Sequence, residues 1–392
     1  MRQRLTSFLF TAALSAACAG TQTVDSKTVR TGAATVALGE RFSAITSLAF
    51  SPDGVLFVAD SGTGKIHSLM PPTASNPASD APYNLTNLDE AIADALGTVP
   101  GKIRVQDLAM HPSTNEAYIA VLRASPEGYG AALMVANQTG QVRMLDPTIK
   151  TNFVQIPGTP AAGFSFYGEV PVRSLTFTDL EYYKGRLLVA GLSTADFASS
   201  LWTVPTPLDG TVDTTTVEIY HAVHNQQETR APIRAMKVVE LDDEPYVIAA
   251  YTCTPLVAFP LAQLVDGVHV TGKTIGELGY GNTPADMLAF TGKDMKQQPF
   301  PVVFMTHKNQ SAQVLSLHGL AQAVRQPGLN SPVMMMSKVD LGALEVPMTG
   351  ILHVEEQNEQ MLVGLRRDAE EGDLELVTFL KNVYFRLSDF QS

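Results

Sequence analysis

Two histidines and a cysteine are the residues of this sequence whose side chains best suit the binding of a transition metal. His221 and His224 are followed by Glu228, and Cys253 comes shortly afterwards, in a chain with only eight histidines and two cysteines. Imidazole, thiolate and carboxylate groups are ligands that proteins use for Zn²⁺ and copper. A metal site formed by His221, His224 and Glu228, with Cys253 nearby, is therefore one hypothesis for this region.

The local structure decides whether these groups can meet. Residues 216–221 read as the end of a β-strand, and in a strand two residues three positions apart face opposite sides. The two imidazoles converge only if the chain turns directly after His221. In the alternative, Glu228 pairs with Arg230 or Arg234, and both histidines are ordinary surface residues.

Cys253 has two further interpretations. As a nucleophile it would need its pKa lowered by a neighbouring cation, for which Arg234 and His224 are candidates. As a structural residue it would be a small buried apolar group, which is the commoner role. The chain has no H-E-x-x-H, G-x-S-x-G or P-loop motif. No complete catalytic constellation is visible, so the sequence leaves open whether the protein is an enzyme.

An internal repeat supplies the elements that must position these residues. Its first copy is an apolar strand at Ile45–Phe50, a Ser-Pro-Asp-Gly turn, a second strand at Val55–Asp60 and a third at Lys65–Leu69. Further copies begin near positions 105, 172, 233, 285 and 349. In the third copy, the innermost strand is expected at Val172–Phe177.

Six units of antiparallel strands indicate an all-β protein, a β-propeller of six blades with four strands each. One such sheet cannot bury both of its faces, so the copies must close into a ring. Thr216–His221 and Thr274–Leu278 are candidate fourth strands. Ala33–Leu38 could pair with the last blade, whose own outer strand would be Asn382–Leu387. Seven blades remain open if Gly130–Leu145 belongs to an extra unit, and a two-domain β-sandwich is the other alternative.

The repeat also sets the expected domain plan. Residues 1–19 form a signal peptide, 20–32 a linker, and 33–392 one propeller domain with an insertion at 70–104. Within that insertion, Leu88–Leu96 has the pattern of a helix capped by Asn87 or Thr86. The run Val333–Met336 reads most simply as a buried strand, with a copper-binding methionine site as the alternative.

In a propeller, the loops entering the innermost strands and the loops leaving the second strands meet at one end of the central channel. This geometry nominates a ring of polar residues as a ligand site. Its members are Asp60, Asp107, Arg173, Arg234, Cys253, Asp286, His307 and Arg366. The three carboxylates among them would suit a hard cation such as Ca²⁺. In the alternative, these residues only pair with one another or cap loops.

The first copy resembles the blade motif of NHL, SMP-30 and YVTN-type propellers, in which Ser-Pro-Asp-Gly precedes a strand that ends in Ala-Asp, here Ala59-Asp60. This resemblance covers Ile45–Leu69 well and the other copies in outline, and it implies the propeller fold. SMP-30-like lactonases hold a catalytic metal with acidic and amide side chains at comparable positions. The resemblance therefore implies a metal-dependent hydrolase as an alternative function, although the first entering loop, 43–45, has no glutamate here.

The N-terminus has the pattern of an export signal, with Arg2 and Arg4, a short apolar run and then small residues. Cleavage before Gly20 would release the protein. Alternatively, the lipobox-like Ser15–Cys18 would make Cys18 the lipidated first residue. We therefore expect an exported protein, either a periplasmic or outer-membrane lipoprotein or a secreted one, that touches a membrane only through such an anchor.

The net charge of −12 argues against nucleic acid as a partner. The partner expected at the channel mouth is a small molecule or a protein, and a divalent metal ion such as Ca²⁺ or Zn²⁺ is the candidate cofactor. The first functional hypothesis is thus a binding or interaction protein. A metal-dependent hydrolase or lactonase and an accessory subunit of a periplasmic redox enzyme are the alternatives.

Overall fold

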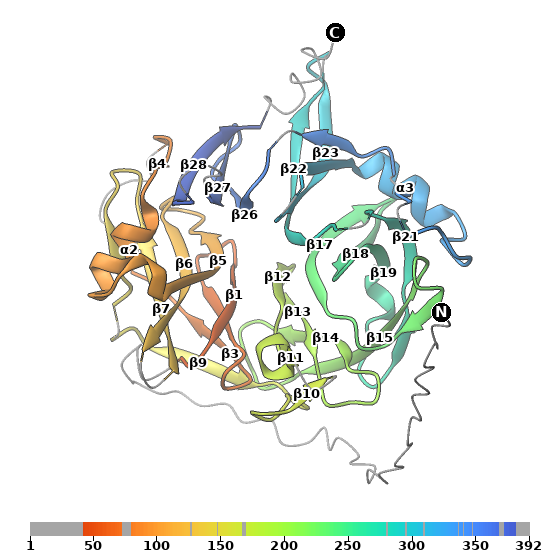
Figure 1. The fold of residues 1–392 in the computed structure, drawn as a ribbon, viewed down its shortest axis with the longest axis horizontal. Helices are drawn as coiled ribbons and strands as arrows, with labels where there is room; N and C mark the ends of the chain where they lie inside the picture. Colours follow the sequence, from red (N-terminus) through yellow and green to blue (C-terminus); the bar gives the residue numbers. More distant parts are fainter. Residues whose placement is uncertain are drawn as a thin grey trace, which may run out of the picture.

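The computed structural model describes residues 42–381, apart from 73–79, 126–127, 147, 167–169, 280, 295, 309, 336, 340, 347 and 368–371. The described chain forms a ring of six mainly antiparallel β-sheets, a six-bladed β-propeller (Figure 1). The predicted fold class is confirmed. Gly130–Leu145 belongs to the second blade and not to a seventh.

Each blade has four strands that follow one another from the channel outward, and the blades are numbered by the chain order of their innermost strands. Blade 1 consists of β1 (Ile45–Phe50), β2 (Leu56–Asp60), β3 (Lys65–Leu69) and β9 (Thr151–Gln155). Blade 2 consists of β5 (Ile103–Met110), β6 (Ala117–Ser125), β7 (Gly128–Ala136) and β8 (Val142–Met144). Blade 3 consists of β12 (Asp179–Tyr183), β13 (Arg186–Leu192), β14 (Ser199–Pro205) and β15 (Asp213–His221).

The second half of the ring has the same plan. Blade 4 consists of β17 (Ile233–Leu241), β18 (Glu244–Tyr251), β19 (Pro255–Pro260) and β21 (Lys273–Glu277). Blade 5 consists of β22 (Pro284–Lys293), β23 (Pro299–His307), β24 (Ala312–Ser316) and β25 (Leu344–Val346). Blade 6 consists of β26 (Ile351–Glu356), β27 (Met361–Arg367), β28 (Leu374–Leu380) and β4 (Asn84–Leu85).

The remaining elements are short and lie outside this plan. The strands β16 (Gln226–Glu228) and β20 (His269–Thr271) both pair with β15, and β10 (Ser165–Phe166) pairs with β11 (Val170–Pro171). The helices are α2 (Leu88–Leu96), α3 (Leu317–Arg325) and the 3₁₀ turns η1 (Pro100–Lys102), η2 (Val172–Leu175) and η3 (Leu261–Gln263). Among the described residues, no helix has the length and apolar character needed to cross a bilayer.

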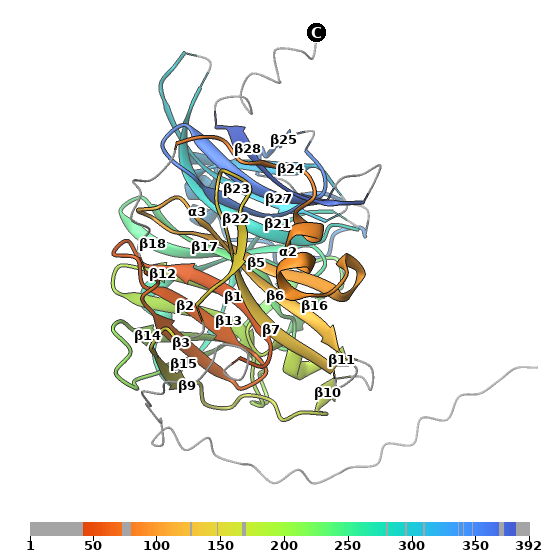
Figure 2. The same cartoon turned by 90° about the vertical axis from the view of Figure 1, so that its left-hand side faces the viewer.

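The blades stack in an order that differs from their order along the chain. Six hydrophobic clusters each join two neighbouring blades. They pair blade 2 with blade 1, 1 with 3, 3 with 4, 4 with 5, 5 with 6, and 6 with 2. Blade 2 therefore lies between blades 6 and 1, as the orange strands between the blue and red ones show in Figure 1. Figure 2 shows blades 1 and 2 side by side from the edge of the ring.

Two connections explain this order. After β3 the chain crosses to blade 6, where β4 pairs with β28, and α2 packs into the cluster shared by blades 6 and 2. After blade 2 the chain returns to blade 1, where β9 pairs with β3. The helix predicted at Leu88–Leu96 is confirmed. The predicted closing strand Ala33–Leu38 and the strand Asn382–Leu387 lie outside the described residues, and β4 occupies the fourth position of blade 6.

The third unit corrects the sequence-based assignment of its innermost strand. Val172–Leu175 forms η2, and the inner strand is β12, which begins at Asp179. Val172 and Phe177 are buried, so a short helical turn and a loop satisfy the apolar pattern expected of a strand. Periodicity alone cannot separate short apolar runs of this kind. As a consequence, Asp179 is the carboxylate that blade 3 contributes to the channel.

The inner strands share a β-bulge near their start. Five of the six shift register, at the second residue in four strands (Thr46, Arg234, Ala285 and Leu352) and at the fourth residue, Gln106, in β5. A bulge redirects the side chains beside it. The channel cavity is lined by residues at and directly after these bulges, among them Gln106 with Asp107 and Ala285 with Asp286.

The segment 326–343 connects α3 to β25 and contains the methionine-rich run. The prediction of a buried strand there was wrong. Val333–Met335 is not assigned to a strand, and the Met334 and Met335 side chains are 77% and 57% exposed. The segment leaves blade 5 and passes over the outer edge of blade 4, where Leu329 donates a backbone hydrogen bond to Thr274.

Candidate functional site

The two histidines lie on the hairpin formed by β15 and β16. β15 ends at His221, and residues 222–225 reverse the chain so that His221 pairs with Gln226. Asn225 has a φ of 52°, a conformation that asparagine tolerates better than most residues. This turn brings the rings of His221 and His224 to 3.8 Å between centroids. The condition for their convergence is therefore met.

Glu228 holds both histidines in one orientation. Its Oε1 accepts hydrogen bonds from His221 Nδ1 at 2.8 Å and from His224 Nδ1 at 2.6 Å. Burial raises the pKa of Glu228, but the hydrogen bonds from the two histidines outweigh it and lower the pKa to about 2. Because the ionised carboxylate can only accept, both Nδ1 atoms donate to it, which leaves the two Nε2 atoms for other partners. Such a carboxylate partner is typical of metal-binding histidines.

Cys253 joins the histidines from blade 4, directly after β18. One ligand atom from each of His221, His224 and Cys253 lies within 4.8 Å of the others. Burial raises the pKa of the Cys253 thiol, and the charges of Glu277 and Glu228 act in the same direction. The free residue is therefore a thiol near neutral pH, which does not fit a nucleophile activated in advance.

A buried carboxylate stands behind this cluster. Glu277 is completely buried, and its Oε1 accepts a hydrogen bond from the Ala222 N–H at 2.8 Å. Its Oε2 has no hydrogen-bond partner among the described residues and lies 4.0 Å from His221 Nε2. His221 Nε2 is also 3.0 Å from Thr254 Oγ1. An unpartnered buried carboxylate oxygen is costly in free energy, and a cation held beside it would offset that cost.

The cluster opens into a cavity of about 580 Å³, lined also by the side of β16 and by residues 229–232 and 252. In a tetrahedral metal site with bonds of ~2.0–2.3 Å, the ligand atoms lie ~3.3–3.8 Å apart. Side-chain adjustments of about 1 Å would therefore complete the three-ligand site. The fourth position of the ion would face the cavity.

The central channel has a different construction, based on three aspartates from alternate blades. Each uses Oδ1 to accept the N–H of the next residue in its own strand. Each uses Oδ2 to accept an N–H from the neighbouring inner strand, at 2.6–2.8 Å. In this way Asp107 joins blades 2 and 1, Asp179 joins blades 3 and 4, and Asp286 joins blades 5 and 6.

The ionisable groups that line the channel shift one another's pKa values. Burial raises the pKa of Asp179 well above its usual range, with the charges of the other two aspartates acting in the same direction, and burial raises the pKa of Asp286 to about 6. His353 Nδ1 lies 3.0 Å from Asp107 Oδ1 and 3.8 Å from Asp286 Oδ2. Arg234 also lines this cavity of about 110 Å³, which has room for about three waters. Every aspartate oxygen already accepts a backbone hydrogen bond, so the three carboxylates serve to join the inner strands.

The structure thus divides the eight residues predicted for one mouth. Asp107, Arg234 and Asp286 line the channel, and Cys253 belongs to the histidine cluster. Asp60 is buried, and its oxygens accept bonds from Ser43, Ala44, Gly62 and Thr63.

Three further members of the predicted ring lie elsewhere. Arg173 donates to the carbonyls of Pro160 and Gly62. Arg366 pairs with Glu375 within blade 6, at 2.5 Å. His307 is buried, and burial lowers its pKa to about 4. None of the four residues Asp60, Arg173, His307 and Arg366 lines the channel cavity.

Sequence reasoning missed four residues of these sites. Asp179 was hidden by the wrong strand assignment in blade 3. His353 occupies the same repeat position as Asp107 and Asp286, so an alignment of the bulged strands would have found it. Thr254 directly follows Cys253 in sequence, whereas Glu277 has no local sequence signal, because only the pairing of β19 with β21 brings it to the cluster.

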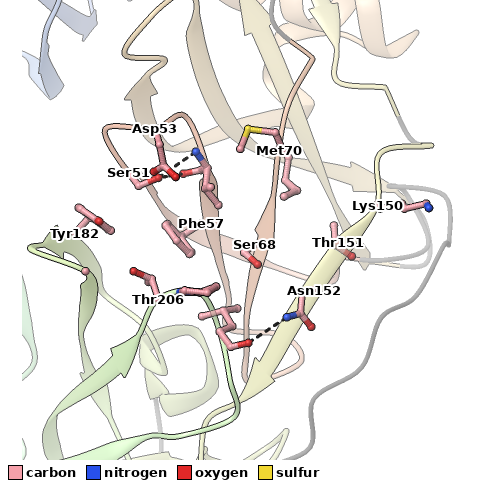
Figure 3. Close-up of a pocket in the computed structure, with 15 residues that line it drawn as sticks. Ser51, Asp53, Phe57, Ser68, Met70, Lys150, Thr151, Asn152, Tyr182 and Thr206 are labelled. Atoms are coloured by element: carbon pink, nitrogen blue, oxygen red, sulfur yellow. Dashed lines mark hydrogen bonds between the residues drawn. The ribbon is translucent and has the colours of Figure 1, made fainter.

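A third cavity, of about 750 Å³, lies at the opposite ends of the strands between blades 1 and 3. Figure 3 shows Phe57 and Ser68 of blade 1 together with Tyr182 and Thr206 from the blade 3 side. The rings of Phe57 and Tyr182 stack with centroids 6.1 Å apart. The lining includes no histidine or cysteine, so this cavity lacks the donors of the histidine cluster.

Comparison with known proteins finds likenesses to solved structures but no related sequence. No family model and no curated protein matches its sequence. Extracellular domains 1–2 of Drosophila semaphorin 1b match with 10% identity over 85% of this chain and 84% of that one, at a TM-score of 0.39. A putative oxidoreductase (glucose dehydrogenase) from Thermus thermophilus matches with 12% identity over 90% of this chain and 100% of that one, at a TM-score of 0.36.

A third solved structure is the PQQ-bound aldose sugar dehydrogenase from Streptomyces coelicolor. It has 11% identity over 90% of this chain and 98% of that one, at a TM-score of 0.29. Shared folds at this level of identity host unrelated functions. No functional conclusion follows from these likenesses, and function must be derived from the sites themselves.

Proposed function

We propose that this propeller is a metal-binding protein whose ion is held by His221, His224 and Cys253 on the rim between blades 3 and 4. The approach of three ligand atoms from two blades to within 4.8 Å carries the proposal. Two nitrogens and one sulfur are a donor set for zinc or copper and not for Ca²⁺. Glu228, which the sequence suggested as a ligand, acts from outside the metal by fixing both imidazoles.

The open fourth position gives the binding hypothesis a concrete form. Three protein ligands plus one exchangeable position is the arrangement of metal sites that bind an external ligand. The cavity of about 580 Å³ has room for a small molecule or a partner side chain at that position. Bound metal would thus present the docking point for the ligand.

Metal binding by the purified full chain tests this proposal. After chelator treatment, we expect the protein to take up one equivalent of Zn²⁺ or copper. Loss of one metal ligand should weaken binding by more than the 10–100-fold typical of supporting residues, so we expect His224→Ala to bind at least about 100-fold more weakly. His318→Ala, at an exposed histidine of α3, is the matched control. Wild-type-like affinity in His224→Ala would refute the proposal.

A metal-dependent hydrolase is the second candidate function, because the open position could hold a water that the ion activates. It differs from the lactonase pattern suggested by sequence, since Asp60 does not lie with Asp107 and Asp286. Zinc-loaded protein should then hydrolyse members of a lactone and ester panel, and Cys253→Ser should abolish the activity. Full metal occupancy without hydrolysis would leave a binding role alone.

Export is a further part of the proposal and rests on the N-terminal pattern of residues 1–19, which lie outside the described residues. Cell fractionation would locate the protein. A lipid anchor on Cys18 predicts that Cys18→Ser moves the protein from the membrane to the soluble fraction. An unchanged distribution of that variant would exclude the anchor.

A further inference from the structure

The segment 326–343 brings methionines to the edge of the histidine cluster. Apart from 336 and 340, its residues are described. Near its tip, the Val333 N–H donates to the Ala222 carbonyl at 3.1 Å, and Ala222 is the residue directly after His221. Further on, Val339 and Glu277 exchange two backbone hydrogen bonds of 2.9 and 3.1 Å. The segment is thus anchored on both sides of the cluster.

Met334 and Met335 occupy this tip with their side chains largely in water. Their exposed fractions are 77% and 57%, although methionine is usually a buried residue. A turn closed by the Ser337 N–H and the Met334 carbonyl follows, at 2.8 Å. Packing gives no reason for two apolar side chains here, because neither is assigned to the hydrophobic clusters of the described chain.

The backbone hydrogen bond between Val333 and Ala222 places this tip beside the turn that carries His224. Two backbones joined by a hydrogen bond are about 4.8 Å apart, and Val333 is joined in this way to the turn that carries His224. Methionine has three rotatable side-chain bonds and a soft, polarisable sulfur. A thioether from the tip can therefore swing over the cavity without movement of the anchored backbone.

We propose that the ion held at this site is Cu(I), and that Met334 or Met335 supplies a thioether as a further ligand. The inference rests on the proposed metal site and deepens it by naming the metal. Thiolate and thioether donors favour Cu(I), whereas Zn²⁺ makes little use of thioethers. The exposed methionines would capture the soft ion at the rim, and one thioether would hold its fourth position exchangeably beside His221, His224 and Cys253, so that a ligand entering the cavity displaces it.

The test compares Cu(I) and Zn²⁺ affinities of the full chain under anaerobic conditions. Bicinchoninate serves as the competing ligand for Cu(I), and a chromogenic chelator serves for Zn²⁺. Met334→Leu/Met335→Leu conserves volume at exposed positions, so the fold is retained. We expect this double variant to lose at least about tenfold in Cu(I) affinity and to keep its Zn²⁺ affinity. X-ray absorption should show one sulfur fewer around copper.

The control is Met70→Leu/Met144→Leu, which changes two other exposed methionines, 53% and 45% exposed. It should leave both affinities unchanged. If the Met334/Met335 variant binds Cu(I) as tightly as the wild type, the thioether inference fails while the metal site stands. If Zn²⁺ and Cu(I) affinities fall together, the methionines do not select the metal. If the wild type binds neither ion, both proposals fail.

Discussion

Cys253 is a proposed metal ligand that also has an unusual backbone conformation. Its φ of +82° lies in a region that residues with a side chain rarely adopt. Such a conformation costs of order 1–3 kcal/mol and is found mainly at functional positions. Glycine would adopt this φ without strain. The presence of cysteine at this position therefore indicates a functional role for its sulfur.

Replacing Cys253 should separate these two contributions. Cys253→Gly relieves the strain, so we expect its metal-free form to be about 1 kcal/mol more stable than Cys253→Ala, which keeps the strained backbone. Both variants should lose metal binding. Urea unfolding of the metal-free variants, followed by circular dichroism, gives the comparison. Equal stabilities of the glycine and alanine variants would show that the conformation carries no strain.

At the scale of elements, the hairpin β15–β16 brings together two histidines that would face opposite sides of a continuous strand. The turn at 222–225 places His224 beside His221, and the Tyr220 hydroxyl donates to Asn225 Oδ1 at 2.8 Å. The positive φ of Asn225 closes the turn. Metal binding should therefore depend on Asn225, although Asn225 is not a metal ligand.

Asn225→Val tests this dependence. A β-branched residue resists positive φ, so we expect the variant to lose about 1–2 kcal/mol of stability and at least about tenfold in metal affinity. Asn225→Gly, which adopts the same φ without cost, should keep its metal affinity. Titration with Zn²⁺ measures both. An Asn225→Val protein that binds metal normally would show that the turn is not required.

At the scale of the whole molecule, the three channel aspartates bind the six blades together in pairs. Each links two inner strands through backbone hydrogen bonds, and His353 adds a contact between blades 6 and 2 through Asp107. Burial of these carboxyls raises the pKa of Asp286 to about 6. The stability of the ring should therefore respond to pH through the channel.

The sign of this response follows from the direction of the shift. The folded state binds the Asp286 proton more tightly than the unfolded state, whose pKa is about 3.8. Its contribution is fully present below pH ~4 and is lost as the pH rises through 6. The raised pKa of His353, on which burial is outweighed by the nearby aspartates, acts with the same sign at higher pH.

We expect the wild type to lose about 2 kcal/mol between pH 4 and pH 7 relative to Asp286→Asn, which cannot titrate. Urea unfolding at several pH values measures the difference. Asp53→Asn, at an exposed turn residue, is the control and should follow the wild type. If Asp286→Asn and wild type show the same pH profile, Asp286 does not couple the channel to pH.

Local sequence was enough to predict most strands of the repeat and to favour six blades. Alternating apolar residues, the Ser51–Gly54 turn and the helix Leu88–Leu96 all appear where patterns place them, because strand and turn preferences act over a few residues. Val172–Phe177 shows the limit, since an apolar run can be buried as a helical turn as easily as a strand. The histidine spacing suggested a metal site but could not show whether the chain turned.

Only the tertiary structure decided which elements are neighbours. Blade 2 lies between blades 6 and 1 because β4 and β9 pair with strands distant in sequence. Backbone hydrogen bonds across a sheet do not depend on residue type, so the sequence does not show which strands pair. The same long-range pairing brings Cys253 and Glu277 of blade 4 to the histidines of blade 3, and brings Met334 to their edge. The sequence by itself thus determined a six-bladed ring and the chemistry available to it. Stacking of the blades, driven by burial of their apolar faces, decided where that chemistry is assembled.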